Sequence, residues 1–150
     1  MTKGMFDLTG KTTVITGGNS GIGLGFAQGI AKQGGDICIW GRNAKKNQMA
    51  SDTIANFGNR VHAIAVDVAD ESSVDKAFAE TLDVFEKVDG CFANAGVGSV
   101  GNFDSQKIED WRQIMDINLE GLFFTLRASA RHMRQRAEAG DSGGRLVGTS

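Results

Sequence analysis

Residues 12–23 read TTVITGGNSGIG, a short run of β-branched residues that ends in closely spaced glycines. The run predicts a buried strand, and the residues after the glycines carry the apolar spacing of a helix. A glycine-rich turn between a strand and a helix lets a phosphate approach the backbone, because Cβ atoms are missing and the helix start offers unpaired N–H groups. The stretch therefore predicts a pyrophosphate site. The triplet Gly10-Lys11-Thr12 precedes the strand instead of following it, which excludes a P-loop.

The rest of the chain continues this alternation of strand-like and helix-like segments. The strands that we expect are residues 12–16, 36–40, 61–66, 88–94 and 145–149. Between them, apolar residues recur three and four positions apart, as on the buried face of a helix: Phe26, Ala27, Ile30 and Ala31, then Ala50, Ile54 and Phe57, then Val74, Phe78, Leu82 and Phe85.

Right-handed crossovers between such strands favour one fold class. The class is α/β, with a Rossmann-type, doubly wound parallel sheet and helices on both faces. The fifth strand would be an unpaired edge with Leu146 and Val147 exposed. We therefore expect residues 1–150 to form a single domain whose sheet is incomplete at its C-terminal side.

Composition narrows the classes of function. The 150 residues are 41% hydrophobic and 23% charged, as in one globular domain, and a net charge of -2 gives no reason to expect nucleic acid as a partner. The start of the chain lacks the apolar core of a signal peptide, and no stretch is long enough for a membrane span, so we expect a cytoplasmic protein with no membrane partner. Cys38 and Cys91 lie in apolar runs without a CxxC partner, which predicts buried thiols and no metal site.

Four motifs follow one another along the chain: TGGNSGIG at residues 16–23, Asp67-Val68, Asn94-Ala95-Gly96 and Asn118. In pattern and order they resemble the motifs of the classical short-chain dehydrogenase/reductase family, whose cofactor motif is T-G-x-x-x-G-x-G. The resemblance covers essentially the whole chain and implies the N-terminal, NAD(P)-binding part of a domain of about 250 residues. It also implies an oxidoreductase that transfers a hydride between a nicotinamide cofactor and the carbonyl or alcohol of a small-molecule substrate.

The resemblance also implies which residues bind the cofactor. In the glycine turn they are Gly17, Asn19, Ser20, Gly21, Ile22 and Gly23, beside the pyrophosphate. Asp67 and Val68 would hold the adenine, and the backbone of Asn94, Ala95 and Gly96 would lie beside the ribose. Ala93 stands where the family usually has an asparagine, a change that we expect to be tolerated. Taken alone, Asp67 is equally typical of a residue that caps the turn after the strand, and Asn94-Ala95-Gly96 of a simple turn.

Asn118 has two interpretations. It falls on an apolar stripe at helical spacing formed by Trp111, Ile114, Met115, Leu122 and Leu126. A core-facing amide needs hydrogen-bond partners, so one interpretation is a satisfied core asparagine. The resemblance implies instead that Asn118 opens the helix locally and holds a water in a proton relay, which makes it the one catalytic residue expected in this chain.

The end of the second strand favours NADP over NAD. A carboxylate there would bind the ribose 2′-hydroxyl of NAD, whereas an arginine would pair with the 2′-phosphate of NADP. The strand ends in Trp40-Gly41-Arg42-Asn43, without an acid; in the family, NAD-specific members carry their Asp at the position of Gly41. We therefore expect NADP, bound with the help of Arg42, Asn43 and the hydroxyl of Ser20, and NAD as the second choice.

The family's proton donor is a tyrosine in a Tyr-x-x-x-Lys motif, and this chain contains no tyrosine. The family's order would place that motif beyond Ser150, so we expect a longer parent enzyme and an inactive 150-residue piece. His62 and His132 lie away from the strand ends near the cofactor, and we expect packing or surface roles for both.

The alternative function is a non-catalytic module that binds a dinucleotide for sensing or assembly. The apolar segment 111–130 favours a homo-oligomer, a tetramer or a dimer, of the parent.

Overall fold

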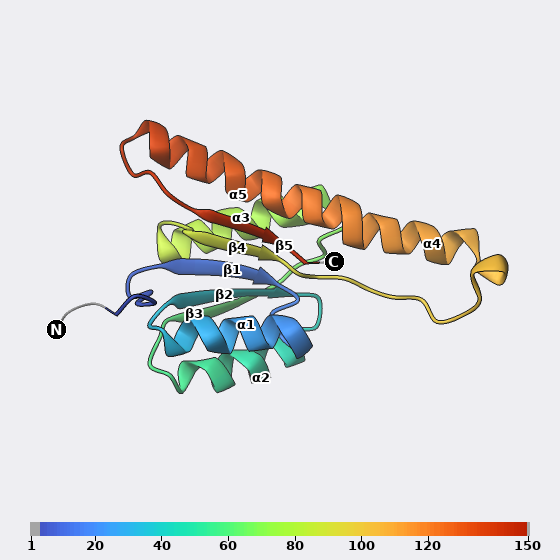
Figure 1. Ribbon diagram of the computed structural model, residues 1–150, viewed down its shortest axis with the longest axis horizontal. Helices are drawn as coiled ribbons and strands as arrows, with labels where there is room; N and C mark the ends of the chain where they lie inside the picture. Colours follow the sequence, from blue (N-terminus) through green and yellow to red (C-terminus); the bar gives the residue numbers. More distant parts are fainter. Residues whose placement is uncertain (1–3, 150) are drawn as a thin grey trace.

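The computed structural model describes residues 4–149, which fold around a sheet of five parallel strands (Figure 1). The strand order is β3-β2-β1-β4-β5. The strands are β1 (Thr12–Thr16), β2 (Asp36–Gly41), β3 (Val61–Ala65), β4 (Gly90–Ala93) and β5 (Arg145–Gly148). Every adjacent pair runs parallel, and β5 is an edge strand on which Leu146 is 42% exposed. The predicted fold class is therefore confirmed.

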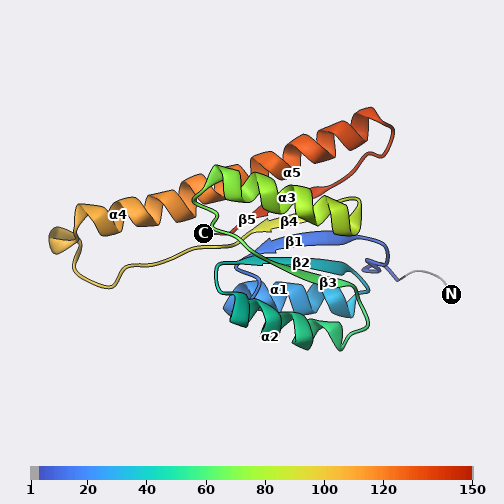
Figure 2. The same cartoon turned by 180° about the vertical axis from the view of Figure 1, so that it is seen from behind.

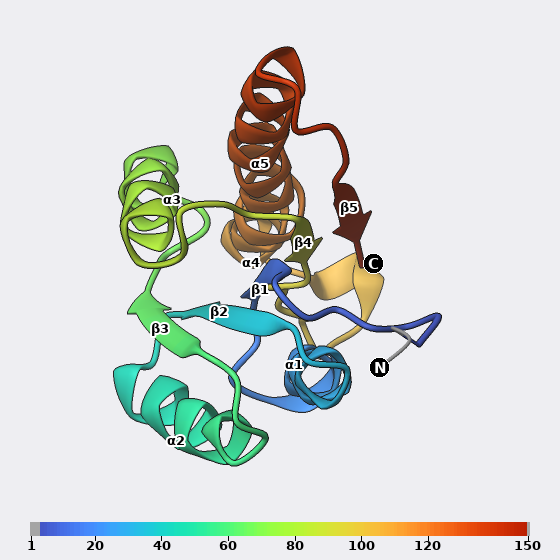
Figure 3. The same cartoon turned by 90° about the vertical axis from the view of Figure 1, so that its left-hand side faces the viewer.

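Helices cover both faces of the sheet (Figures 2 and 3). One face carries α1 (Gly21–Lys32) and α2 (Ala44–Ala55). The other carries α3 (Glu71–Phe85) and a long helix made of α4 (Ile108–Met115), a π-helical turn η2 (Asp116–Glu120) and α5 (Gly121–Glu138). A short 3-10 helix, η1 (Phe103–Ser105), precedes α4. In the described part of the chain, no helix combines the length and the apolar character that a membrane crossing requires.

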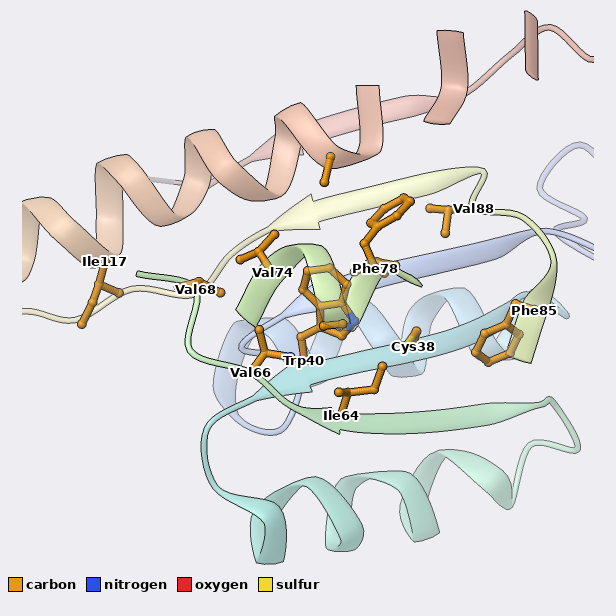
Figure 4. Close-up of a cluster of buried hydrophobic side chains, with 13 residues drawn as sticks. Cys38, Trp40, Ile64, Val66, Val68, Val74, Phe78, Phe85, Val88 and Ile117 are labelled. Carbon is orange, nitrogen blue, oxygen red and sulfur yellow. The ribbon is translucent and has the colours of Figure 1, made fainter. Parts of the chain in front are cut away.

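The two faces of the sheet build two separate cores, because successive side chains of a strand point to opposite faces. Ile37 and Ile39 of β2 pack in the cluster of α1 and α2. Cys38 and Trp40 pack in the larger cluster beside α3 and α5, where the Trp40 ring meets Phe78 edge-on (Figure 4). The Trp40 indole N–H donates to the Thr81 hydroxyl at 3.1 Å, so this buried polar atom is satisfied.

The predicted cysteine environment is confirmed. Cys38 and Cys91 are both buried and free. Burial raises the pKa of each thiol to about 11, which keeps both protonated at neutral pH. They serve as small apolar side chains of the core.

Some predicted boundaries were wrong. The fourth strand begins at Gly90 and not at residue 88, because the Val88 N–H donates to the His132 side chain and the Val88 carbonyl accepts from Arg136, both on α5. Helix α2 ends at Ala55, so Phe57 lies beyond it, 41% exposed, with the Lys32 ammonium 5.7 Å from its ring. The apolar stripe at residues 111–126 is also incompletely buried, since Trp111 is 47% exposed.

Candidate dinucleotide site

The chain leaves β1 toward β2 and β3 and then returns to place β4 on the opposite side of β1. Ligands of open α/β sheets bind where the strand order reverses in this way, beyond the carboxyl ends of the strands. A cavity of about 490 Å³ lies at that position, within the size range of cofactor sites. We refer to it as the crevice.

Most of the residues that the sequence singles out line this crevice. They are Gly17, Asn19, Ser20, Ile22, Arg42, Asn43, Asp67, Val68, Asn94, Ala95 and Gly96. Gly21, Gly23 and Asn118 do not line it. Further lining residues, not predicted as site residues from the sequence, are Trp40, Gly41, Lys46, Val66, Val97 and Ile117.

The glycine turn is shaped by two different requirements. Gly17 has a φ of +65°, a conformation that side chains disfavour, and it faces Asn94 and Ala95. Gly23 is needed for close packing: a Cβ there would overlap the Gly17 carbonyl and lie 2.6 Å from the Asn94 side-chain nitrogen. Gly23 therefore lets α1 pack closely against the turn, so that the start of the helix lies at the crevice. Gly23 itself does not line the crevice.

The start of α1 keeps its hydrogen-bonding capacity free. Ser20 occupies the N-cap position, but its side chain makes no bond to the helix backbone, and the first turn contains no acid. The Ser20 hydroxyl instead lies 3.4 Å from the Asn19 side-chain oxygen. Free N–H groups and the positive end of the helix dipole favour an anion at this point.

Thr16 organises the opposite wall of the crevice, a role that was not predicted from the sequence. Its buried hydroxyl accepts hydrogen bonds from the backbone N–H groups of Asn94 and Ala95, both at 2.8 Å. The Asn94 side chain in turn donates to the Thr16 carbonyl at 3.1 Å and accepts from the Thr149 hydroxyl at 3.1 Å. The segment Asn94–Gly96 is thus attached to the ends of β1 and β5, beyond what a simple turn requires.

Asp67 and Val68 form the wall after β3. One Asp67 carboxylate oxygen accepts from the Ala69 N–H at 3.1 Å, so the turn-capping interpretation of Asp67 holds for that oxygen. The Asp67 N–H donates to the Ser73 hydroxyl at 3.2 Å, which fixes the loop before α3. Val68 packs so closely on Gly121 that a Cβ at position 121 would lie 2.7 Å from a Val68 methyl. The loop after β3 is therefore held against the start of α5.

Two cations meet at the crevice beyond β2. Arg42 follows the strand, and Lys46 lies one turn into α2, whose N-cap Asn43 accepts the Lys46 backbone N–H at 3.0 Å. Both side chains line the crevice, and neither has an ion-pair partner among residues 4–149. The helix capped by Asn43 therefore brings a second cationic residue to the crevice that Arg42 lines. A lysine in a polar run of the sequence does not predict this position.

Asn118 lies in the π-helical turn Asp116–Glu120, beside the crevice wall. Its side-chain oxygen accepts from the Val97 N–H and its nitrogen donates to the Val97 carbonyl, both at 2.9 Å. Asn118 is exposed, so its predicted place on a core-facing stripe was wrong; the wider π turn shifts the residues after Met115 around the helix axis. The amide joins the long helix to the loop that follows Gly96.

Comparison with known proteins gives one consistent result. Residues 11–150 match the model of the family described as short chain dehydrogenase. A curated relative, the 3-oxoacyl-(acyl-carrier-protein) reductase FabG of Chlamydia pneumoniae, is 32% identical over 126 residues, which are 84% of this chain and 51% of the relative. The chain thus spans about half the length of the curated relatives that it matches.

Solved structures with the same arrangement include complexes with either nicotinamide dinucleotide. NAD+-bound xylitol dehydrogenase superimposes with a TM-score of 0.90 at 27% identity, over 95% of this chain and 54% of that one. A short chain dehydrogenase from Burkholderia cenocepacia in complex with NADP gives a TM-score of 0.84 at 30% identity, over 96% of this chain and 56% of that one. The neighbours therefore do not distinguish between the two dinucleotides.

Proposed function

Because the chain belongs to the short-chain dehydrogenase family, a family of oxidoreductases, we propose that it forms the dinucleotide-binding part of an NADP-dependent oxidoreductase. The observation that carries the choice of NADP is the charge at the end of β2. Arg42 and Lys46 both line the crevice there, without an ion-pair partner among the described residues. Two free cations attract a phosphate, and an arginine binds it through two parallel hydrogen bonds.

The donors of the crevice fit the remaining groups of such a cofactor. The uncapped start of α1 and the glycine turn in the crevice wall offer a place for the pyrophosphate. The second oxygen of Asp67 and the side chain of Val68 are available for an adenine, and the backbone at Asn94–Gly96 for a ribose. These assignments agree with what the family resemblance implies. Gly21, whose φ is +52°, and the closely packed Gly23 would act through the shape of the turn.

The residues of this chain bind and orient; the bound nicotinamide would supply the hydride. Thr16 holds the segment Asn94–Gly96 in place, so the nicotinamide half would meet a prearranged wall. Asn118 is proposed as a positioning group that fixes the loop after Gly96 and lies ready to hold a water. The tyrosine of the family would have to come from outside these 150 residues, which contain none.

The proposal extends to substrate and assembly in general terms. The substrate would be a small-molecule alcohol or ketone, and the whole protein a homo-oligomer, tetrameric or dimeric. The long helix supports the second point, because four of its large apolar side chains are about half exposed: Ile108, Trp111, Leu119 and Phe123.

The proposed function is tested by titrating the protein with NADPH and with NADH, following the fluorescence of the reduced nicotinamide. Arg42→Ser should weaken NADPH binding by at least about tenfold, since a phosphate contact of this kind contributes about 1.4 kcal/mol or more, and should leave NADH almost unchanged. Arg131→Ser, an exposed arginine on α5 outside the crevice, is the matched control and should change neither affinity. Equal losses for both dinucleotides in Arg42→Ser would contradict the assignment of NADP.

A further inference from the structure

A buried amide lies behind the crevice and is not part of its wall. Asn47, on the first turns of α2, is only 3% exposed. Its side-chain nitrogen donates to the Gly41 carbonyl at 2.8 Å and to the Ile64 carbonyl at 3.1 Å. Because both protons of that nitrogen are used by carbonyl groups, the Asn47 oxygen faces the other way, where it accepts from the Asn19 side-chain nitrogen at 2.7 Å.

These bonds join three separate parts of the site. Gly41 ends β2, Ile64 belongs to β3, and Asn19 belongs to the glycine turn after β1. A buried polar side chain that satisfies three partners is strongly restricted in position. Asn47 therefore sets where the Asn19 amide lies, directly over Gly41.

The consequence concerns the space at Gly41. A Cβ at this position would lie 2.6 Å from the Asn47 oxygen and would overlap the Asn19 side-chain nitrogen. The backbone of Gly41 is that of an ordinary strand residue, since it pairs with Ala65 and its φ is not positive. The three atoms nearest to such a Cβ all belong to these two amides, so the amides and not the backbone conformation oppose a side chain at position 41.

We propose that Asn47 is a positioning residue that determines dinucleotide specificity, because through Asn19 it closes position 41 to the carboxylate that would favour NAD. Arg42 and Lys46 supply the attraction for a phosphate, and the Asn19–Asn47 pair removes the competing arrangement. Specificity commonly needs both an attractive and an excluding element. The inference rests on the proposed function, since it concerns which dinucleotide the crevice selects.

The test is a double-mutant cycle between positions 41 and 47, with NADPH affinity as the readout. Gly41→Ala adds only the Cβ and should weaken NADPH binding by at least about tenfold in the wild-type background. In the Asn47→Ala background the Asn19 amide is released, and the same Gly41→Ala change should alter the affinity by less than about threefold. Equal effects in the two backgrounds, or no effect in the wild type, would overturn the proposal.

A charged variant gives the second readout, the ratio of the affinities for NADPH and NADH. A general loosening of the fold would not change this ratio. Gly41→Asp alone should lose NADPH affinity without gaining NADH affinity. Gly41→Asp with Asn47→Ala should shift the ratio of the two affinities toward NADH by at least about tenfold. A gain of NADH affinity by Gly41→Asp with Asn47 intact would overturn the proposal, because the carboxylate would then fit beside the amides.

Two controls separate the possible failures. If the wild-type protein binds neither dinucleotide, both the proposed function and this inference are refuted. If the wild type binds NADPH but the effects of the changes at positions 41 and 47 are simply additive, only the inference is refuted. Urea unfolding of each variant verifies that it is folded under the assay conditions. Should Asn47→Ala not fold, Asn19→Ala removes the nearer of the two amides and provides the second background. The effect of Gly41→Ala should then be smaller than in the wild type but not abolished, because the Asn47 oxygen still lies 2.6 Å from the added Cβ, and an undiminished effect would overturn the proposal.

Discussion

The two ends of the sheet both gather charged groups, but the groups are used differently. At the carboxyl end, Arg42 and Lys46 line the crevice without an ion-pair partner among residues 4–149, and α1 begins without a side-chain cap. At the amino end, Asp89 and Arg136 pair with each other at 3.1 Å, each only about a tenth exposed. Charges that satisfy one another hold a structure together, while charges left free at a cavity are available for a ligand.

The amino end is a connected network. The Arg136 guanidinium also donates to the Val88 carbonyl at 2.7 Å and to the Asp141 carboxylate at 2.7 Å. Burial by itself would raise the pKa of Asp89, but the Thr12 N–H and the Lys11 ammonium outweigh it and hold that pKa below its ordinary value. The network ties the end of α5 to the starts of β1 and β4.

The largest expected effect is the loss of this network. Arg136→Ala leaves the largely buried Asp89 carboxylate and the Val88 carbonyl without the guanidinium, and should lower the free energy of unfolding by about 2–3 kcal/mol. Urea unfolding at neutral pH measures it. NADPH affinity of the folded variant should remain, because the crevice lies at the opposite end.

Arg134→Ala is the matched control for this change. Arg134 pairs with Glu138 one turn away on the same helix, and both side chains are about 70% exposed. Its loss should cost less than about 0.5 kcal/mol. Similar losses of stability in the two arginine variants would mean that the buried Arg136–Asp89 pair stabilises the fold no more than an exposed ion pair. The structural role assigned to the charges at the amino end would then be contradicted.

A smaller loss of stability, together with a loss of NADPH affinity, is expected when the Thr16 hydroxyl is removed. Thr16→Val keeps the shape but leaves the Asn94 and Ala95 N–H groups without their acceptor, which should cost about 2 kcal/mol. Because these groups hold the crevice wall, NADPH affinity should fall as well. Thr16→Ser retains the hydroxyl and should preserve most of both properties. A serine variant as weak in binding as the valine variant would assign the effect to packing of the methyl group and not to the hydrogen bonds.

The smallest expected effect is a pH dependence at the amino end. His132 accepts the Val88 N–H at 3.1 Å, and burial together with the nearby Arg136 lowers its pKa from the ordinary value of 6.5. The unfolded chain therefore binds this proton more readily than the folded one. The stability that depends on neutral His132 is complete above pH 6.5 and is lost as the pH falls through that value toward the lower pKa of the folded state.

Urea unfolding between pH 7.5 and pH 5 measures this loss. His132→Gln offers an oxygen that accepts the Val88 N–H and does not titrate, so the variant should lose less stability than the wild type over this range. An unchanged pH dependence in His132→Gln would show that the histidine is not its source.

Some parts of the molecule were predictable because their causes are local. The β-branched run at residues 12–16 forms β1 as predicted, and the glycines that follow it lead into α1 at the crevice. The crevice position of Arg42 also follows from the strand before it. The limits of β4 and the exposure of Phe57 were not predictable, because they depend on partners such as His132 and Lys32 that lie far away along the chain.

By itself, the sequence determined the α/β fold, the family and the edge of the sheet at which a dinucleotide would bind, since strand and helix periodicity and a glycine turn are properties of neighbouring residues. Only the tertiary structure decided which polar groups are free there. Lys46 reaches the crevice, Thr16 holds its wall, and Asn47 closes the space at Gly41. Hydrogen bonds between separate strands and helices set these roles, so no local pattern of residues contains them.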